Sequence, residues 1–262
     1  MEYNNICNRL QEVDVILKSK RKQVIMETLK RDQMVTLETL MRLIDTSEST
    51  IRRDLDELEV ENKLRRVHGG AELRQGLQDE LTNQQKSIKN SHEKARIAEV
   101  ASQMIDQRDV IFIDAGTTTA FLIEKLHSLE VTVVTNSIHH ATALVDKGIK
   151  TIIIGGTVKL STDASVGHMA IEQVNRLNLD KAFIGMNGID SEFLTTPDFD
   201  EATIKRAVIA NSQQTFVLAD ASKIGQKAFV KVDTIDKVVI ITDKCTTAVV
   251  QELQKKTRVI EV

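Results

Sequence analysis

The sequence predicts an α/β protein built from two modules: a small helical module, followed by a doubly wound, mostly parallel α/β domain. Two observations support this fold class. Up to about residue 70, apolar residues recur at three- and four-residue spacing, as in amphipathic helices, without strand-like runs. Beyond residue 93, short apolar runs rich in β-branched residues alternate with helical stretches. That alternation is typical of a parallel sheet covered by helices on both faces.

Composition narrows the functional class. The chain has 262 residues, and 35 Lys and Arg against 38 Asp and Glu leave it close to neutral. This balance argues against a protein that coats nucleic acid, but it permits a small DNA-reading module. Two distant cysteines, Cys7 and Cys245, suit a reducing, cytoplasmic environment without a disulfide framework. We expect no membrane span, since no apolar run approaches ~20 residues, and no secretory signal.

Four segments follow from the changes in pattern. Residues 1–19 form an N-terminal extension, for which a frayed segment is favoured over a pairing helix. Residues 20–74 form the helical module, with a first helix over Arg21–Leu29. Residues 75–93 are polar and indicate a linker or a solvated helix. Residues 94–262 form the larger domain.

Residues 35–61 predict two short helices joined by a tight turn. Thr36 can cap a helix over Leu37–Ile44, and Ser47 can start a second helix that runs to about Glu61. This is a helix-turn-helix, whose second helix presents its N-terminal residues to base edges and phosphates. The candidate DNA contacts in this region are Thr36, Ser47, Ser49, Thr50, Arg52 and Arg53.

The next segment, Lys63–Ala71, has the composition of a basic hairpin. Arg65, Arg66 and His68 can face a phosphate backbone, and Gly69-Gly70 permits a tight turn. A solvated hairpin without a function is the alternative. Its position directly after a helix-turn-helix favours a wing, and thus a winged helix-turn-helix that binds DNA.

The stretch TIRRDLDELEVENKLRRVHGGA resembles the N-terminal signature of the DeoR family of bacterial transcriptional regulators. This resemblance implies that the stretch is a recognition helix and wing that bind double-stranded operator DNA. It does not cover the first 19 residues.

In the larger domain, six apolar runs predict strands and the stretches between them predict helices. The strands are Val110–Ile113, Val131–Val134, Thr151–Ile154, Lys181–Ile184, Thr215–Leu218 and Lys237–Ile241, and the helices include Thr119–His127, Ala141–Lys147 and Asp200–Ala210.

The turn after the first of these strands predicts an anion site. A strand, a small-residue turn and a helix N-terminus present backbone N–H groups and hydroxyls to an anion. The turn lacks the Walker lysine and the GxGxxG spacing, and therefore suits a single phosphate. A simple capped turn is an equally good interpretation. The candidate residues are Asp114, Gly116, Thr117, Thr118 and Thr119.

Small and polar residues follow other predicted strands as well. Ligands of open α/β sheets bind at the carboxyl ends of the strands, so these residues are candidates for one site. In TTPDFDEATIKR, Glu201 and Lys205 can bind a ligand or form a surface pair four residues apart. The further candidates are Asn136, Ser137, Gly155, Gly156, Lys159, Asn187, Gly188, Asp198, Glu201, Lys205, Asp220 and Lys223.

These motifs also resemble the DeoR family, whose effector domain carries D-x-G-[ST]-T, T-N, G-G and D-x-[ST]-K elements and an H-E-K-x-x-I-A start, here His92–Ala98. The resemblance implies a domain similar to ribose-5-phosphate isomerase and glucosamine-6-phosphate deaminase, with a phosphosugar as inducer and no cofactor. VTNSIHHA, STDASVG, AFIGMNGID and LTTPDFDEATIK most resemble fructose operon repressors, which implies fructose 1-phosphate. Tagatose 6-phosphate and glycerol 3-phosphate are the alternatives.

An enzyme is the competing functional class. Asp114, Asp198, Glu201 and Asp220 could provide acid and base for sugar isomerisation. The fused helix-turn-helix decides against this, because an isomerase has no use for it. The histidines, including His139-His140, lack metal-site spacing, and neither cysteine has a catalytic context. We therefore expect a phosphosugar-responsive repressor, a homodimer or homotetramer, with 75–93 as the route from effector to DNA.

Overall fold

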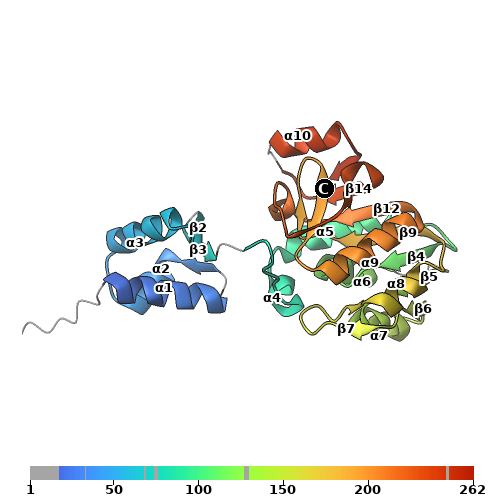
Figure 1. The fold of residues 1–262 in the computed structure, drawn as a ribbon, viewed down its shortest axis with the longest axis horizontal. Helices are drawn as coiled ribbons and strands as arrows, with labels where there is room; N and C mark the ends of the chain where they lie inside the picture. The colour runs from blue at the N-terminus through green and yellow to red at the C-terminus, as the bar shows by residue number, and fades with distance from the viewer. Residues whose placement is uncertain (1–17, 33, 68, 74–75, 127–129, 246–247) are drawn as a thin grey trace, which may run out of the picture. The chain divides into compact units, whose positions relative to one another are not determined.

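The structure, a computed structural model, describes residues 18–32, 34–67, 69–73, 76–126, 130–245 and 248–262. The chain forms two compact units, residues 1–75 and 76–262 (Figure 1). Most of the predicted N-terminal extension, including Cys7, lies outside the described residues.

The first unit is a winged helix-turn-helix. Its elements are α1 (Lys18–Asp32), β1 (Met34–Thr36), α2 (Leu37–Ile44), α3 (Glu48–Val60), β2 (Leu64–Val67) and β3 (Gly70–Leu73). The strands form an antiparallel sheet in the order β1-β3-β2. Thr36 and Ser47 cap α2 and α3 through their hydroxyls, as the sequence predicts. A Cβ at Gly70 would lie 2.1 Å from the Val35 carbonyl oxygen, so the wing requires glycine there.

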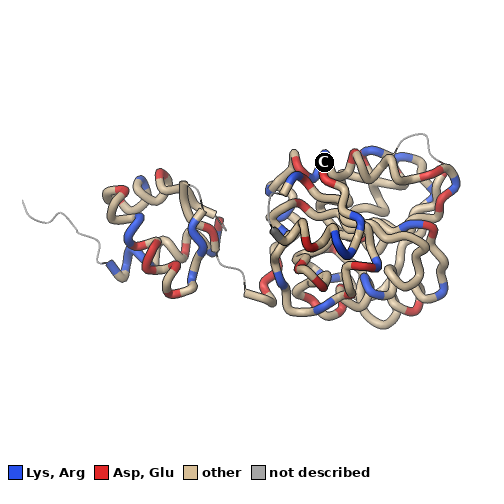
Figure 2. The backbone as a smooth tube through the Cα atoms, turned by 90° about the horizontal axis from the view of Figure 1, so that it is seen from above, with Lys and Arg blue, Asp and Glu red and all other residues tan. Residues whose placement is uncertain are grey.

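Helices α1 and α3 are joined by ion pairs over a shared apolar core. Arg21 Nε lies 2.7 Å from Asp54, whose side chain is 1% exposed, and Lys22 Nζ contacts both Glu57 and Glu61. The acidic second half of α3 thus has cationic partners in its own unit. In Figure 2 the Lys and Arg segments alternate with Asp and Glu segments along the backbone of this unit.

The second unit is a doubly wound α/β domain, which confirms the predicted fold class. Its seven-stranded parallel sheet has the order β15-β14-β12-β9-β4-β5-β6. The six predicted strands are all present in it, and β15 is an addition. The strands are β4 (Val110–Ile113), β5 (Thr132–Thr135), β6 (Lys150–Ile153), β9 (Leu179–Gly185), β12 (Ser212–Leu218), β14 (Val239–Thr242) and β15 (Val259–Glu261).

Helices cover both faces of this sheet (Figure 1). One core contains Ile111 and Ile113 with α5 (Ser91–Ser102), α6 (Thr117–Lys125) and α7 (Ile138–Asp146). The opposite core contains Phe112 with α8 (His168–Val174), α9 (Phe199–Ala210) and α10 (Ala248–Gln254). Side chains that alternate along each strand fill both cores, which explains the continuous apolar runs in the sequence.

Smaller elements surround the carboxyl edge of the sheet. The remaining strands are β7 (Thr157–Val158), β8 (Ser165–Val166), β10 (Gly188–Ile189), β11 (Phe193–Thr196) and β13 (Val230–Thr234), and the remaining α-helix is α4 (Asn83–Ile88). Short 3₁₀ turns follow β12 and β13 at Ala221–Lys223 and Ile235–Lys237. Within the described ranges, no helix combines the length and apolar character needed to cross a bilayer.

The structure corrects the interpretation of residues 75–93 as a linker. Residues 76–93 belong to the second unit and contain α4 and the start of α5. Asn83 and Asn90 form hydrogen bonds to Thr162 and Asp220 of that unit. The alternative interpretation, a solvated helix, fits α4 better, because none of its residues is buried.

Candidate functional site

The start of α3 presents hydroxyls and arginines at the surface of the first unit. Ser47 Oγ lies 3.0 Å from Ser49 Oγ and 2.9 Å from Thr50 Oγ1. Arg52 pairs with Glu48 one turn earlier, and Arg53 is exposed with no ion pair among the described residues. Hydroxyls and an arginine are thus accessible at this end of the helix, and its contact with DNA stays a prediction.

The two described arginines of the wing carry carboxylate partners. Arg65 pairs with Glu72 across the hairpin, and Arg66 pairs with Asp56 of α3. To bind a DNA phosphate, either arginine would have to exchange its carboxylate partner for the phosphate. Thr36 uses its hydroxyl to cap α2, which limits it as a DNA contact. His68 lies outside the described residues.

The second unit has a switch point between β4 and β9, where the strand order reverses. Asp114 follows β4 at this point, and its Oδ2 accepts a hydrogen bond of 3.0 Å from the Gly185 N–H at the end of β9. Lys205, on α9, pairs with the same oxygen. Burial lowers the pKa of Lys205, but the charges of Asp114 and Glu201 outweigh it and raise that pKa. Ligands of open α/β sheets bind at such switch points.

The predicted anion turn is present but uses only part of its hydroxyl set. Gly116 precedes α6 without a side-chain cap. Thr119 is fully buried, and its hydroxyl donates to the carbonyl oxygens of Asp114 (2.7 Å) and Gly116 (2.8 Å). Thr119 therefore shapes the turn, while Thr117 and the largely buried Thr118 begin the helix.

His140 adds a buried imidazole beside this turn. Burial lowers the pKa of His140 to about 4, against the opposing influence of Asp114 and of a backbone hydrogen bond at Gly116. Its Nδ1 is buried without a hydrogen-bond partner among the described residues. The sequence places the His139-His140 pair beside the site or in an interface. His140 occupies the first location, whereas His139 is exposed and lies 3.4 Å from Asp163.

Several predicted site residues also hold the loops at the edge of the sheet in place. Asn136 Oδ1 accepts from the Ala115 N–H at 3.0 Å, and Ser137 caps α7. Gly155 exchanges two hydrogen bonds with the Gln173 side chain. A Cβ at Gly156 would meet the Val166 carbonyl oxygen at 2.5 Å, and one at Gly188 would meet that of Gln226 at 2.6 Å. These positions have clear packing roles.

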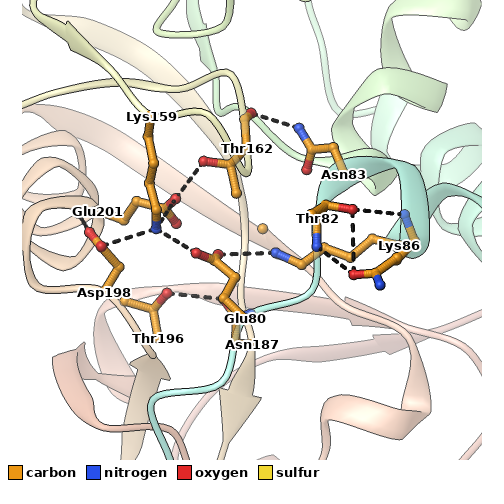
Figure 3. A network of polar contacts seen from close by, with 12 residues as sticks. Glu80, Thr82, Asn83, Lys86, Lys159, Thr162, Asn187, Thr196, Asp198 and Glu201 are labelled. Atoms are coloured by element: carbon orange, nitrogen blue, oxygen red, sulfur yellow. Dashed lines mark hydrogen bonds and ion pairs between the residues drawn. The ribbon is translucent and has the colours of Figure 1, made fainter. Parts of the chain in front are cut away.

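A polar cluster around Lys159 brings together predicted residues from distant parts of the chain (Figure 3). Lys159 Nζ lies 3.0 Å from Asp198, 3.1 Å from Glu201, and in contact with Glu80. Burial lowers the pKa of Lys159, but the carboxylates raise it well above its usual range. Glu201 also accepts a bond of 2.8 Å from Thr162. In the same view Asn187 accepts from Thr196 at 2.9 Å.

The surface pair between Glu201 and Lys205, the alternative to ligand binding, is not among the ion pairs of the described residues. Both side chains are buried, and they contact Lys159 and Asp114 instead. Carboxylates held in this way can accept hydrogen bonds from ligand hydroxyls. The arrangement therefore suits the functional interpretation of Glu201 better than the alternative.

Next to this cluster, a buried lysine, Lys94, lies within the electrostatic influence of Asp220 and three other lysines. Lys94 is 4% exposed, and its ammonium donates to the Lys86 carbonyl oxygen. Burial lowers the pKa of Lys94 to about 8; Asp220 counteracts this, while Lys223, Lys86 and Lys89 lower the pKa further. Asp220 itself accepts a bond of 2.8 Å from Asn90. Several lysines near the buried Lys94, with Asp220 as the opposing charge, make this region attractive to an anion.

Sequence reasoning assigned only Asp220 and Lys223 to this group. Lys86 and Lys89 were left out because 75–93 was interpreted as a linker or a solvated helix, and Lys94 was treated only as part of the start of the effector domain. One available signal was that Lys94 is the lysine of the H-E-K-x-x-I-A motif. Among the described residues, no three or more His, Cys, Asp or Glu are placed to hold a metal ion.

Comparisons with known proteins cover both units. Residues 21–75 match the model of the DeoR-like helix-turn-helix domain. Residues 89–244 match that of the DeoR C terminal sensor domain.

Full-length relatives give the same result. The chain is 38% identical to an uncharacterized HTH-type transcriptional regulator FruR of Bacillus subtilis (strain 168), over 92% of this chain and 97% of that protein. It is 33% identical to the HTH-type transcriptional repressor GlcR of the same organism, over 86% and 88% of the two chains. It is also 33% identical to the glycerol-3-phosphate regulon repressor of Escherichia coli (strain K12), over 84% and 88%.

Among solved structures, a ribose 5-phosphate isomerase from Methanocaldococcus jannaschii matches with a TM-score of 0.40 and 20% identity, over 52% of this chain and 55% of that one.

Proposed function

Because this chain belongs to the DeoR family of helix-turn-helix transcriptional regulators, we propose that it is a repressor released from double-stranded operator DNA by a small phosphosugar. The family and its relatives are transcriptional regulators, not enzymes. In this proposal the carboxylates at the sheet edge bind the hydroxyl groups of the phosphosugar and do not act as acid and base in a reaction.

The observation that carries the phosphosugar proposal is the buried Lys94 among other lysines. A cation held at 4% exposure with three other lysines nearby is costly even beside Asp220, and a phosphate would offset that cost. Lys86 and Lys223 would contribute to the same phosphate contact. The hydroxyl-accepting cluster at Lys159 is linked to this group, because Glu80 contacts both Lys159 and Lys86. One small ligand that carries a phosphate and hydroxyl groups could contact both the lysines near Lys94 and the carboxylates around Lys159.

The similarity to the glycerol-3-phosphate regulon repressor supports a small phosphorylated molecule as effector. Within that class we propose a fructose operon as the target and fructose 1-phosphate as the effector. The 38% identity to FruR over almost the entire chain favours this choice.

An operator-release experiment tests the ligand class. Fluorescence anisotropy of the repressor–operator complex would be followed with fructose 1-phosphate, fructose 6-phosphate, tagatose 6-phosphate and glycerol 3-phosphate, with unphosphorylated fructose as control. We expect fructose 1-phosphate to release DNA at the lowest concentration. Release by fructose alone, or by no phosphosugar, would contradict the proposal.

We further propose that two or four copies bind repeated half-sites, since winged helices usually read successive major grooves as symmetric pairs. Sedimentation of the complex on operators with one and two half-sites measures this stoichiometry. A single copy bound with full affinity to one half-site would contradict it.

A further inference from the structure

Glu80 lies at the point where the chain passes from the DNA-binding unit into the effector domain. The DNA-binding unit ends at residue 75, so Glu80 is among the first residues of the second unit. Its side chain is nevertheless only 9% exposed, because it is inserted into the polar cluster around Lys159. One carboxylate oxygen contacts Lys159, and the other lies 3.1 Å from Lys86 Nζ (Figure 3).

The residues after Glu80 are attached to the same site. The Asn83 N–H donates to the Ser161 carbonyl oxygen at 2.9 Å, and Asn83 Nδ2 donates to that of Thr162 at 2.6 Å. Asn90 reaches Asp220 at 2.8 Å. Residues 80–90, which we call the latch segment, thus contact the loop that carries Lys159 and the loop that carries Asp220 and Lys223.

In the cluster around Lys159, one lysine is shared by three carboxylates. Lys159 contacts three carboxylates, of Glu80, Asp198 and Glu201, and Glu80 alone among them belongs to the latch segment. Burial raises the pKa of Glu80, but Lys86 and Lys159 outweigh it and hold that pKa below its usual value. Glu80 is therefore an ionised carboxylate bound between two lysines, as an anionic group of a ligand would be.

We propose that Glu80 is an internal competitor of the effector. Without ligand, its carboxylate bridges Lys159 and Lys86 and holds the latch segment on the site. A phosphosugar placed against the same lysines repels Glu80 and replaces it, which releases the segment next to the DNA-binding unit. This inference rests on the proposed function and specifies how ligand binding reaches the DNA-binding unit. A ligand can shift such an equilibrium only through different affinities for the two states, and competition with Glu80 provides that difference.

The test compares Glu80→Gln with Asp79→Asn as a matched control. Asp79 is the exposed neighbour of Glu80, and its substitution also removes one negative charge. Among the described residues its side chain accepts a hydrogen bond from the Gly76 N–H and forms no ion pair. Three quantities are measured for each variant and for wild type: operator affinity without ligand, fructose 1-phosphate affinity by calorimetry, and deuterium uptake of residues 77–90.

In wild type, we expect deuterium uptake of this segment to rise when fructose 1-phosphate is added. In Glu80→Gln it should be high without ligand, with operator affinity lowered and ligand affinity raised by about tenfold or less. Asp79→Asn should behave as wild type. The inference is overturned if ligand protects the segment, or if Glu80→Gln matches Asp79→Asn in all three measurements.

The outcome also separates this inference from the proposed function. If no phosphosugar binds wild type, the proposed function fails. The proposed role of Glu80 is then tested by the deuterium uptake and the operator affinity of Glu80→Gln alone. If both equal the wild-type values, the role of Glu80 is rejected.

Discussion

Lys205 and Asp114 form an ion pair that is almost completely removed from solvent, with 5% and 3% of their side chains exposed. The pair joins α9 to the end of β4 at the switch point of the sheet. Desolvation of two charges is costly, and their attraction repays that cost only when both partners are present. The same ion pair therefore fixes the position of α9 at the site and contributes to the stability of the domain.

Removal of one partner should be strongly destabilising. We expect Lys205→Met to lower the free energy of unfolding by about 3–5 kcal/mol, because it leaves a buried carboxylate without its cation. Urea denaturation of Lys205→Met, Asp114→Asn and the double variant measures this. The double variant should lose clearly less than the sum of the single losses, and strict additivity would show that the two groups are not coupled.

His140 should make the domain acid-sensitive. The pKa of His140 is about 4 in the folded chain, below its ordinary value of 6.5, so the unfolded chain takes up a proton first as the pH falls. Stability should therefore decline from about pH 6.5 towards pH 4, by up to about 3 kcal/mol from this group. His140→Gln should show a flatter profile over this range in thermal unfolding. The exposed His139→Gln is the control, and identical profiles for the two variants would contradict the assignment.

Arg53 should contribute to operator binding. It is exposed near the start of α3, and an arginine that reads a base or phosphate there is worth about 1–3 kcal/mol. We expect Arg53→Ala, and likewise Arg52→Ala, to weaken operator binding in gel shifts while calorimetry shows unchanged phosphosugar binding. Arg108→Ala removes the same charge from an exposed position of the effector domain. If it weakens DNA binding equally, net charge rather than position explains the loss.

The charged side chain of Lys94 should lower the stability of the folded domain while it contributes to ligand binding. With its pKa lowered to about 8 by burial, the charged side chain disfavours folding by up to about 3 kcal/mol below pH 8, and this cost falls as the pH rises towards 10.5. Lys94→Met should therefore unfold at a higher temperature near pH 7.

Lys94→Met should also bind operator but show no thermal shift with fructose 1-phosphate, and Lys223→Ala should share this insensitivity. Lys244→Met, at an exposed position, should respond as wild type. A full ligand response in Lys94→Met would remove Lys94 from the site.

The sequence predicted the fold well because its periodicities are local. The caps at Thr36 and Ser47 and the strand Val110–Ile113 occur where the pattern indicates. Strand β15 and the hairpin β7–β8 were missed, since runs of two or three residues carry too little periodicity.

The site was predicted less completely, because proximity across the sheet edge is not encoded in spacing. Asp114, Lys159 and Glu201 were identified, whereas Glu80 and Lys94 were not. The proposed role of Glu80 depends on residues 76–93 packing against loops that lie more than fifty residues away in sequence. Conversely, Thr119 and Asn136 belong to the right turns, but their polar atoms are engaged by backbone groups.

The ion pairs within the DNA-binding unit have a consequence for salt dependence. Each DNA phosphate neutralised by a protein cation releases bound counterions and adds about −0.9 to the slope of log affinity against log salt concentration. Because Arg21, Lys22, Arg65 and Arg66 already have carboxylate partners, one copy should release few counterions. We expect a shallow slope for a single half-site. Affinity on a full operator would then depend on how many copies bind together more than on the charge of each one.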